Sequence, residues 1–448
     1  MFRTLAAFAL ALGLAAGLQA QPAKAGPAIL VDVDSGEVLF ANRAFDRWHP
    51  ASITKLLTAY LAFDAIRSGR LQPDSPVTMS QNALSNPPSK MGFPVGTRIT
   101  LSAALKMLIV KSANDIAVAI GETVGGSEPE FVAMMNRTAQ RLGMTNSHFE
   151  NPHGLHHPNQ YTTARDMAVL ARAIHREFPQ YQNLFEIPAI RVGRKTLRSH
   201  NRLVGRYPGT TGMKTGYICA GAYNLVASAK RGRTHLIAVV LGAPNGRYRS
   251  LVAAHLLENG FDRSRGFFSS SRTTIDSFRG AGREPFDMRP YVCKPRSQRP
   301  PLPREIASYG FDVPIVNAND DDDEGEDESD PVGTRGAAAI QVSSGGGRMT
   351  RAERIAAYLA GPASGTTVNA NGMLAKDELA SMSMPRTIPA PMPRMASANR
   401  MPAANTPLPG AVAPPPAALV PPPAAAPMTG DAAGLRLSIP VPRRRPVR

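Results

Sequence analysis

The amino-acid sequence predicts an α+β fold, in which an antiparallel sheet flanked by helices is built from both ends of one domain and carries an inserted all-helical subdomain. Three observations predict this class. Residues 28–43 contain two apolar runs around turn residues, residues 53–178 repeat apolar side chains at helical spacing, and residues 223–243 contain two more strand-like runs. An amphipathic stretch at residues 247–259 follows. The order is therefore strands, helices, strands and a final helix.

The first strands are expected in "AILVDVDSGEVLFANR", where Asp34, Ser35 and Gly36 supply a turn and so predict a hairpin. An apolar run from Ile53 to Ile66 has the length and spacing of a helix. Three further helices are expected over residues 101–124, 130–142 and 163–178.

The second group of strands is expected at residues 223–230 and 235–243, which are β-rich and joined by four residues. So short a connection predicts an antiparallel pair. The helix at residues 163–178 opens with Thr163 and Asp166 at capping-box spacing, with Asp in place of the usual Glu or Gln.

Composition divides the 448-residue chain into three parts. Residues 1–25 pair an arginine with a short apolar stretch and end at a small-residue site, which is typical of a secretory signal peptide. A membrane anchor is the alternative, but the apolar core is short for a span. We expect a folded domain over residues 26–265 and a mainly disordered, Pro/Ala-rich tail over residues 266–448, with an acidic run at 320–330.

The formal net charge of +17 raises the question of a polyanionic partner. Nucleic acid is not expected, because export argues against it and no basic helix carries interleaved aromatic residues. Weak peripheral association with a membrane or wall polymer, or simple solvation, are the alternatives. Cys219 is expected as a small packed residue, with a disulfide to Cys293 as the alternative. The nine histidines lack ligand spacing, so no metal and no cofactor are predicted.

The stretch "HPASITKLLTAY" places Ser52 three positions before Lys55 at the start of a helical run. A serine hydroxyl needs a base within hydrogen-bond reach to become a nucleophile, and lysine is such a base when burial or a second cation lowers its pKa. The alternative is that Ser52 is a plain N-cap. The pair is the sole Ser-x-x-Lys in the sequence.

Two other short motifs carry polar groups. Lys214-Thr215-Gly216 precedes Tyr217 and a strand-like run, so it suits a sheet edge where a glycine lets a substrate backbone approach closely. Its cation and hydroxyl suit a carboxylate. Ser112 and Asn114 form a Ser-x-Asn within the apolar helical block, where polar residues need partners or a function.

The set Ser-x-x-Lys, Ser-x-Asn and Lys-Thr-Gly, in this order, resembles the penicillin-binding protein and serine β-lactamase superfamily. Longer stretches such as "KSANDIAVAIGETVGG" and "GMKTGYICAGAYNLVASAK" resemble the low-molecular-mass D-alanyl-D-alanine carboxypeptidases, over roughly residues 26–265. The resemblance implies a β-lactamase/transpeptidase-like fold and a DD-peptidase catalytic domain in an exported protein of the bacterial periplasm or cell envelope.

The resemblance implies a serine DD-carboxypeptidase that removes the terminal D-alanine from peptidoglycan stem pentapeptides. Ser52 would be acylated, Lys55 would take its proton, and Ser112 would relay a proton to the leaving D-alanine. The backbone N–H groups of Ser52 and Tyr217 would form the oxyanion hole. β-Lactams would imitate the substrate and acylate Ser52 irreversibly or slowly.

The same resemblance implies a set of substrate-binding residues. Asn114 would bind the substrate amide, and Lys214 and Thr215 would hold the terminal carboxylate, which an arginine after the "VVLGAP" run would also meet. Arg249 matches that arginine best by spacing, with Arg247 as the rival.

Three alternative functions remain at this point. A DD-endopeptidase that cuts crosslinks would use the same three motifs. A β-lactamase is disfavoured, because no Glu-x-x-Leu-Asn run is present, and a non-catalytic peptidoglycan-binding scaffold would be free to lose the motif residues. The resemblance departs at the C-terminus, where neither a small β domain nor an amphipathic membrane helix is visible. His153 of "NPHGL" is expected in a loop near the site, with a structural role.

Overall fold

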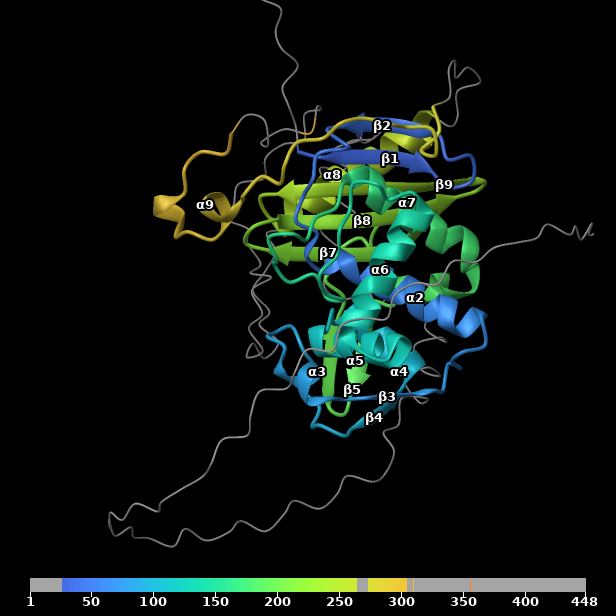
Figure 1. Cartoon of the computed structure of the whole chain (residues 1–448). Coiled ribbons are helices and arrows are strands. Elements are labelled where there is room, and N and C mark those ends of the chain that lie inside the picture. Colours follow the sequence, from blue (N-terminus) through green and yellow to red (C-terminus); the bar gives the residue numbers. More distant parts are fainter. Residues whose placement is uncertain (1–25, 264–272, 304–308, 310–354, 356–448) are drawn as a thin grey trace, which may run out of the picture. The chain divides into compact units, whose positions relative to one another are not determined.

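The computed structural model describes residues 26–263, 273–303, 309 and 355. Its centre is a five-stranded sheet with the order β2-β1-β9-β8-β7, and each neighbouring pair is antiparallel (Figure 1). Both ends of the domain contribute to this sheet, so the predicted α+β class is confirmed. The strands are β1 (Ala28–Asp32), β2 (Val38–Asn42), β7 (Thr210–Ile218), β8 (Ala222–Arg231) and β9 (Thr234–Ala243).

The central strand β9 separates two apolar cores. Leu236 and Val240 pack on the face covered by α8 (Gly246–Arg263), whereas Ile237 and Val239 belong to the core on the other face. Alternate residues of a strand point to opposite faces, so a run that is apolar throughout can serve both cores. The helices therefore cover the sheet on two sides (Figure 1).

The second face and the inserted subdomain are helical, as the sequence predicts. Thr163 caps one of these helices, and its hydroxyl accepts a hydrogen bond from the Asp166 amide at 3.0 Å. This is one half of the predicted capping box, since the Asp166 carboxylate accepts from the Asn146 amide and the Ser147 hydroxyl. The helices are α2 (Lys55–Arg67), α3 (Gln81–Ser85), α4 (Leu101–Val110), α5 (Asn114–Gly125), α6 (Glu128–Leu142), α7 (Ala164–Glu177) and the 3₁₀ helix η2 (Pro179–Glu186).

One expected helix is two. The apolar repeat predicted a continuous helix over residues 101–124, but the chain breaks between α4 and α5. Ser112 lies in the break with a φ of +64°, in the left-handed region. A residue in that conformation ends a helix, and the periodicity of the apolar side chains does not report it.

Two small antiparallel pairs were not expected from the sequence. They are short and only partly buried, so their apolar alternation is weak. The pairs are β3 (Pro76–Thr78) with β4 (Arg98–Thr100), and β5 (Ala189–Val192) with β6 (Lys195–Arg198).

The expected end of the folded domain at residue 265 needs a correction. Residues 273–303, here called the strap, are ordered against the domain although the composition assigned them to the tail. The Ile275 amide donates to the Gly36 carbonyl at 2.8 Å, and the side chains of Ile275 and Met288 have no exposed surface. A few large apolar anchors at wide spacing hold this segment, which gives no periodic signal. The strap also carries α9 (Arg289–Val292) and η3 (Arg296–Gln298).

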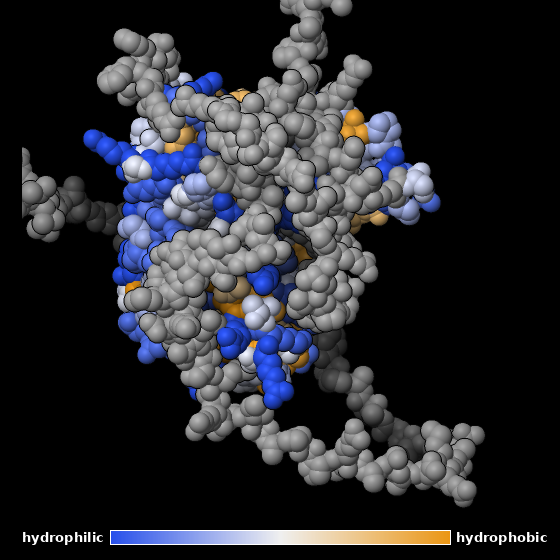
Figure 2. All heavy atoms as spheres, turned by 180° about the vertical axis from the view of Figure 1, so that it is seen from behind, coloured by the Kyte–Doolittle hydropathy of each residue, from blue (hydrophilic) through white to orange (hydrophobic). Residues whose placement is uncertain are grey.

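The expected signal peptide at residues 1–25 and the acidic run at 320–330 lie outside the described residues. Within the described part of the chain, no helix has both the length and the apolar character needed to cross a membrane. Where the surface in Figure 2 is coloured, most of it is hydrophilic, with apolar residues scattered between.

Candidate active site

Ser52 and Lys55 lie next to each other at the start of α2. The Lys55 Nζ atom is 2.8 Å from the Ser52 Oγ atom. Lys55 has no exposed surface, whereas Ser52 is partly open to solvent. A nucleophile must be reachable and its base is best kept from water, and this pair meets both conditions.

The local backbone shows why the two side chains meet. Ser52 is not an N-cap, the alternative that the sequence left open, but the second residue of the 3₁₀ helix η1 (Ala51–Thr54), which runs directly into α2. In a 3₁₀ turn, residues i and i+3 are eclipsed on one side, so Ser52 and Lys55 point the same way. Ala51 has a φ of +50°, a strained value that marks the sharp entry into this turn.

Two further groups hold the Lys55 amine. It donates to Asn114 Oδ1 at 2.7 Å and to the His153 carbonyl at 2.9 Å. The Asn114 Nδ2 atom donates to the Pro87 carbonyl at 3.0 Å, which fixes the amide so that its oxygen faces the lysine. The structure thus brings together Ser52 of η1, Lys55 of α2 and Asn114 of α5.

The loop that carries His153 packs directly against the turn that contains Ser52. Gly154 has a φ of +92°, and a Cβ placed there would stand 1.9 Å from the Ala51 carbonyl oxygen. Only glycine fits such an approach. The sequence predicts His153 near the site, whereas Gly154 looks there like an ordinary loop glycine.

The His153 ring is a neutral group under ordinary conditions. Burial, and secondarily the nearby Lys55 charge, lower the pKa of His153 to about 3. Its Nδ1 atom accepts a hydrogen bond from the Leu155 amide at 3.1 Å. An imidazole in this state does not exchange protons near neutral pH, which agrees with the structural role expected for it.

Ser112 and Lys214 form a second pair. The Lys214 Nζ atom donates to Ser112 Oγ at 2.9 Å and to the Thr215 carbonyl at 3.0 Å. Both side chains are almost fully buried. The helix break between α4 and α5 turns Ser112 toward β7, so the unpredicted break is what brings the two motifs together.

Lys214, Thr215 and Gly216 lie on β7, which is the edge strand of the sheet, as the sequence predicted. The structure shows a further reason for the glycine, beside the expected approach of a substrate backbone. A Cβ on Gly216 would stand 2.9 Å from the Ser52 amide nitrogen, so the close approach is to the turn that carries Ser52. Glycine here lets the sheet edge and the Ser52 backbone meet.

Asn224 on β8 is a positioning residue that the sequence analysis missed. Its Nδ2 atom donates to the carbonyls of His49 and Pro50 at 3.0 and 3.1 Å, and its Oδ1 atom accepts from the Gly242 amide at 3.0 Å. Asn224 has no exposed surface. A lone amide inside the apolar run "YNLVASAK" is the signal that could have found it, because buried polar groups need partners.

Tyr217 and Arg249 occupy different surroundings. Tyr217 is 38% exposed on the edge strand. Arg249 has no exposed surface, and its guanidinium donates to the carbonyls of Asn224 and His200, both at 3.4 Å. Its rival Arg247 is partly exposed. The structure therefore places Arg249 behind the sheet edge, and it is not open to solvent in this arrangement.

The two cysteines form a disulfide between Cys219, one residue after β7, and Cys293 of the strap. This corrects the expectation that Cys219 is a small packed residue. The Met288 amide of the strap donates a hydrogen bond to the Ala220 carbonyl at 3.0 Å. This contact lies beside Cys219 and brings the two sulfurs together. Sequence separation of 74 residues concealed this proximity.

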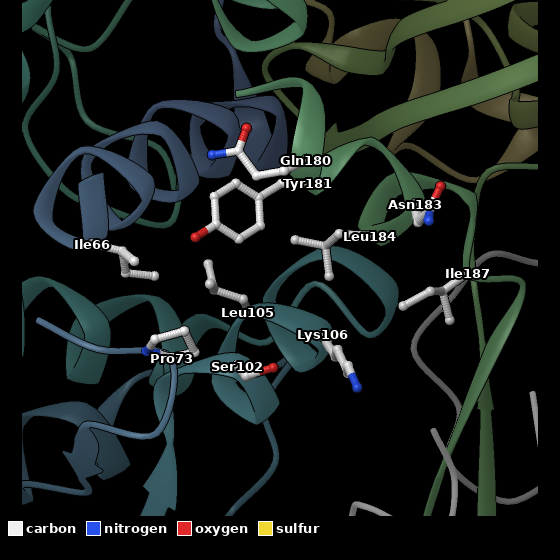
Figure 3. Close-up of a pocket in the computed structure, with 10 residues that line it drawn as sticks. All are labelled: Ile66, Pro73, Ser102, Leu105, Lys106, Gln180, Tyr181, Asn183, Leu184 and Ile187. Carbon is white, nitrogen blue, oxygen red and sulfur yellow. The ribbon is translucent and has the colours of Figure 1, made fainter. Parts of the chain in front are cut away.

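A pocket of about 200 Å³ lies away from these residues. It is lined by side chains from the end of α2, from α4 and from η2, among them Ile66, Leu105, Lys106 and Tyr181 (Figure 3). None of the predicted site residues lines it. Among the described residues, no group of three His, Cys, Asp or Glu side chains is arranged to hold a metal ion.

Comparisons with known proteins show which family this chain resembles. The family Peptidase S11, described as D-alanyl-D-alanine carboxypeptidase, matches residues 15–245. The D-alanyl-D-alanine carboxypeptidase DacD of Salmonella typhimurium is 37% identical over 243 residues, which cover 53% of this chain and 62% of the relative. DacD of Escherichia coli is 36% identical over 243 residues, covering 53% and 63%. The chain thus spans less than two thirds of the length of these curated relatives.

Solved structures give the same result. Penicillin binding protein 5 from Haemophilus influenzae superposes with a TM-score of 0.52 at 33% identity, covering 55% of this chain and 73% of that protein. Penicillin binding protein 6B from Escherichia coli gives a TM-score of 0.51 at 35% identity, covering 55% and 80%.

Proposed function

We propose that this chain, which belongs to the Peptidase S11 family of D-alanyl-D-alanine carboxypeptidases, is a serine DD-carboxypeptidase acting on peptidoglycan stem peptides. The observation that carries the proposal is the contact of the buried Lys55 amine with the accessible Ser52 hydroxyl at 2.8 Å. The reaction would release the terminal D-alanine through an acyl-enzyme on Ser52.

In the acylation step, Ser52 Oγ attacks the carbonyl carbon of the penultimate D-alanine and its proton passes to Lys55 Nζ. The three partners of Lys55 fit both proton states of the amine. A neutral amine donates to Asn114 and to the His153 carbonyl and accepts the Ser52 hydroxyl, whereas an ammonium donates to all three. The amine has no exposed surface, so the serine proton would pass to a group kept away from water.

In the second half of the step, the C–N bond breaks and the leaving D-alanine nitrogen takes a proton. Ser112 would deliver that proton and be reprotonated by the Lys55 ammonium, which returns Lys55 to its neutral state. The hydrogen bond from Lys214 would hold the Ser112 hydroxyl in place for this transfer. The carbonyl oxygen of the tetrahedral intermediate would be held by the N–H groups of Ser52 and Tyr217. Water would then attack the ester, release the shortened peptide and restore the Ser52 hydroxyl.

Substrate binding is assigned to the remaining residues. Lys214 and Thr215 would hold the terminal carboxylate, and Asn114 would bind the substrate amide. Arg249 would add positive charge behind the sheet edge, since its buried guanidinium lies 5.8 Å from the ring centroid of Tyr223 on β8.

The proposal extends to inhibitors and to location. Relatives named as penicillin binding proteins support covalent reaction of Ser52 with β-lactams. The signal-peptide pattern at residues 1–25 supports export to a bacterial periplasm or cell envelope. The net charge of +17 supports weak association with an anionic membrane or wall polymer.

A fluorescent penicillin tests the chemistry. We expect one label per chain, located on Ser52 by mass spectrometry, and no label on Ser52→Ala. No label, or label on another residue, would refute the acyl-enzyme. Release of D-alanine from a pentapeptide, measured beside cleavage of a crosslinked dimer, then separates a carboxypeptidase from an endopeptidase.

A further inference from the structure

The edge strand β7 has one open end. Near its start, a Cβ on Gly212 would stand 2.5 Å from the Phe185 Cβ atom, so η2 packs against this end of the strand. At the other end, Tyr217 is 38% exposed. Extended peptides bind sheet edges by adding a strand, and the part of β7 that is exposed here is its end, at Tyr217 and Ile218, whereas Lys214 to Gly216 are buried.

Two points on this edge give a bound peptide its direction. This step rests on the proposed function, which places the terminal carboxylate at Lys214 and the scissile carbonyl at Ser52. Gly216 lies against the Ser52 amide, since a Cβ on it would be 2.9 Å away. The direction from carboxylate to scissile bond therefore runs from Lys214 past Gly216 toward Tyr217. The residues upstream of the two D-alanines must continue in that direction.

The strap lies beside the end of β7 toward which the upstream residues of the peptide would extend. The Tyr217 hydroxyl is 3.2 Å from the Cys293 Sγ atom, and Cys293 is bound to Cys219 at the end of β7. Helix α9 immediately precedes Cys293, and in Figure 1 it lies beyond the ends of β7 and β8. The strap is thus adjacent to the exposed end of β7.

The strap is also fixed to the segment that carries the nucleophile. The Phe286 ring is stacked on Trp48 with centroids 6.3 Å apart, and the Arg47 amide donates to the Arg283 carbonyl at 2.9 Å. Trp48 is buried and lies four residues before Ser52. Together with the disulfide to β7, these contacts hold the strap against both halves of the site.

A charged pair lies on this part of the strap. The Arg289 guanidinium is 3.0 Å from the Asp287 carboxylate, and their side chains are 46% and 50% exposed. Both charges act on His49 and His156, whose rings are 4.9 Å apart. His49 lies three residues before Ser52, so the pair is near the site and remains accessible from solvent.

We propose that the disulfide-anchored strap forms the wall of the substrate groove beyond Tyr217, and that it binds the part of the donor peptide upstream of D-alanyl-D-alanine. The Arg289–Asp287 pair meets a charged side chain of that part. The strap therefore selects long stem peptides over short ones, and the disulfide keeps it in position. It takes no part in the bonds that form and break at Ser52.

Substrate length tests the proposal in the full chain. The measured quantity is the ratio of kcat/KM for a stem pentapeptide to kcat/KM for a blocked tripeptide that ends in D-alanyl-D-alanine. We expect the ratio to fall about tenfold in the Cys219→Ser, Cys293→Ser double variant and about threefold in Arg289→Ala. The matched control is Arg279→Ala, an arginine of the strap that donates to the carbonyls of Asp276 and Phe278. Its ratio should not change.

Fluorescent penicillin labelling separates the two proposals. It should remain within about twofold of wild type in every variant, because a penicillin has no upstream peptide. If both variants keep the wild-type ratio and label normally, the strap does not bind the upstream peptide, whereas the proposed carboxypeptidase function is unaffected. Absence of labelling in the wild type would overturn the proposed function itself. If the double variant has lost its thermal transition, Arg289→Ala alone decides.

Discussion

The Lys55 Nζ atom lies 2.8 Å from the Ser52 Oγ atom and shares no surface with solvent. Its other partners, Asn114 Oδ1 and the His153 carbonyl, can only accept hydrogen bonds. Two N–H groups of the lysine are therefore used by these acceptors, and the remaining N–H or lone pair of the nitrogen faces the Ser52 hydroxyl. This arrangement restricts which side chain can function at position 55.

Lys55→Arg should lower the rate of penicillin acylation by at least about a thousandfold, although it keeps the charge. A guanidinium does not give up its proton in proteins, so it cannot take the Ser52 proton. Lys55→Met should fail equally, since it has similar length and no base. The rate is measured by stopped-flow or gel labelling, with circular dichroism to verify folding. An arginine variant within tenfold of wild type would contradict the role of Lys55 as base.

Ser112→Ala and Ser112→Gly should lose acylation to the same extent, about a hundredfold, because both remove the hydroxyl that contacts Lys214. Their stabilities should differ. Ser112 has a φ of +64°, which glycine adopts without strain, so the glycine variant should be about 1 kcal/mol more stable than the alanine variant. Urea unfolding and labelling rates measure the two effects. If activity followed stability instead of the hydroxyl, Ser112 would be structural only.

Gly154→Ala should damage the site through the backbone. Its Cβ would stand 1.9 Å from the Ala51 carbonyl oxygen, so the turn that carries Ser52 must move. We expect a loss of about 3 kcal/mol in unfolding free energy and at least about a hundredfold slower labelling. Gly143→Ala is the matched control, because its φ of +79° is similar but nothing lies within 4 Å of the added atom. Equal effects of both substitutions would disprove the proposed collision.

Local signals sufficed for the main elements and the motif residues. The continuous β-rich runs that became β8 and β9, and the helical repeat that became α2, are visible in adjacent residues. Ser52 and Lys55 are the first and last of four consecutive residues that make one turn, so their contact follows from local helical geometry. The pairing of Ser112 with Lys214 followed only from the resemblance, because 102 residues separate them.

Features set by distant backbone were not predictable. The break at Ser112 lies inside an unbroken apolar repeat, and the space at Gly154 is defined by the Ala51 carbonyl, about a hundred residues away in sequence. The strap has too few apolar residues to show a period and is held by Ile275, Met288 and a disulfide. Such anchors are recognised only when their partners are in place.

The buried pair of His175 on α7 and His235 on β9 should make the domain sensitive to acid. Burial lowers the pKa of His175 to about 3 and that of His235 to about 4. The ordinary value is 6.5, so the unfolded chain binds protons that the folded chain does not. Stability should therefore fall as the pH decreases from about 6.5 to about 3, by up to about 1.4 kcal/mol per pH unit for each ring.

His175→Phe tests this dependence, since the His175 Nε2 atom is buried without a hydrogen-bond partner among the described residues and a phenyl ring fits an apolar site. Unfolding free energy measured from pH 7 to pH 4 should have a slope smaller by about 1 kcal/mol per pH unit. Ile174→Val, a change of the buried neighbouring residue, should lower stability equally at each pH. An unaltered slope in His175→Phe would assign the acid sensitivity to other groups.

A chain that ends after residue 265 should be much less stable than one that ends after residue 309, although composition placed the boundary at the former. The shorter chain loses the Cys219–Cys293 disulfide and leaves the sites of Ile275 and Met288 empty. It also loses Tyr309, a buried residue whose hydroxyl donates to the Leu241 carbonyl at 2.7 Å. Loss of a disulfide and of one large apolar side chain each cost about 2–5 kcal/mol, so the shorter chain should unfold at physiological temperature. Differential scanning calorimetry of the two chains measures this, and equal melting temperatures would show that the strap adds nothing to the stability of the fold.

The same two chains should differ in penicillin labelling. Labelling of Ser52 needs the folded turn at Trp48, on which Phe286 of the strap stacks. The longer chain should therefore label like the full protein, and the shorter one should not.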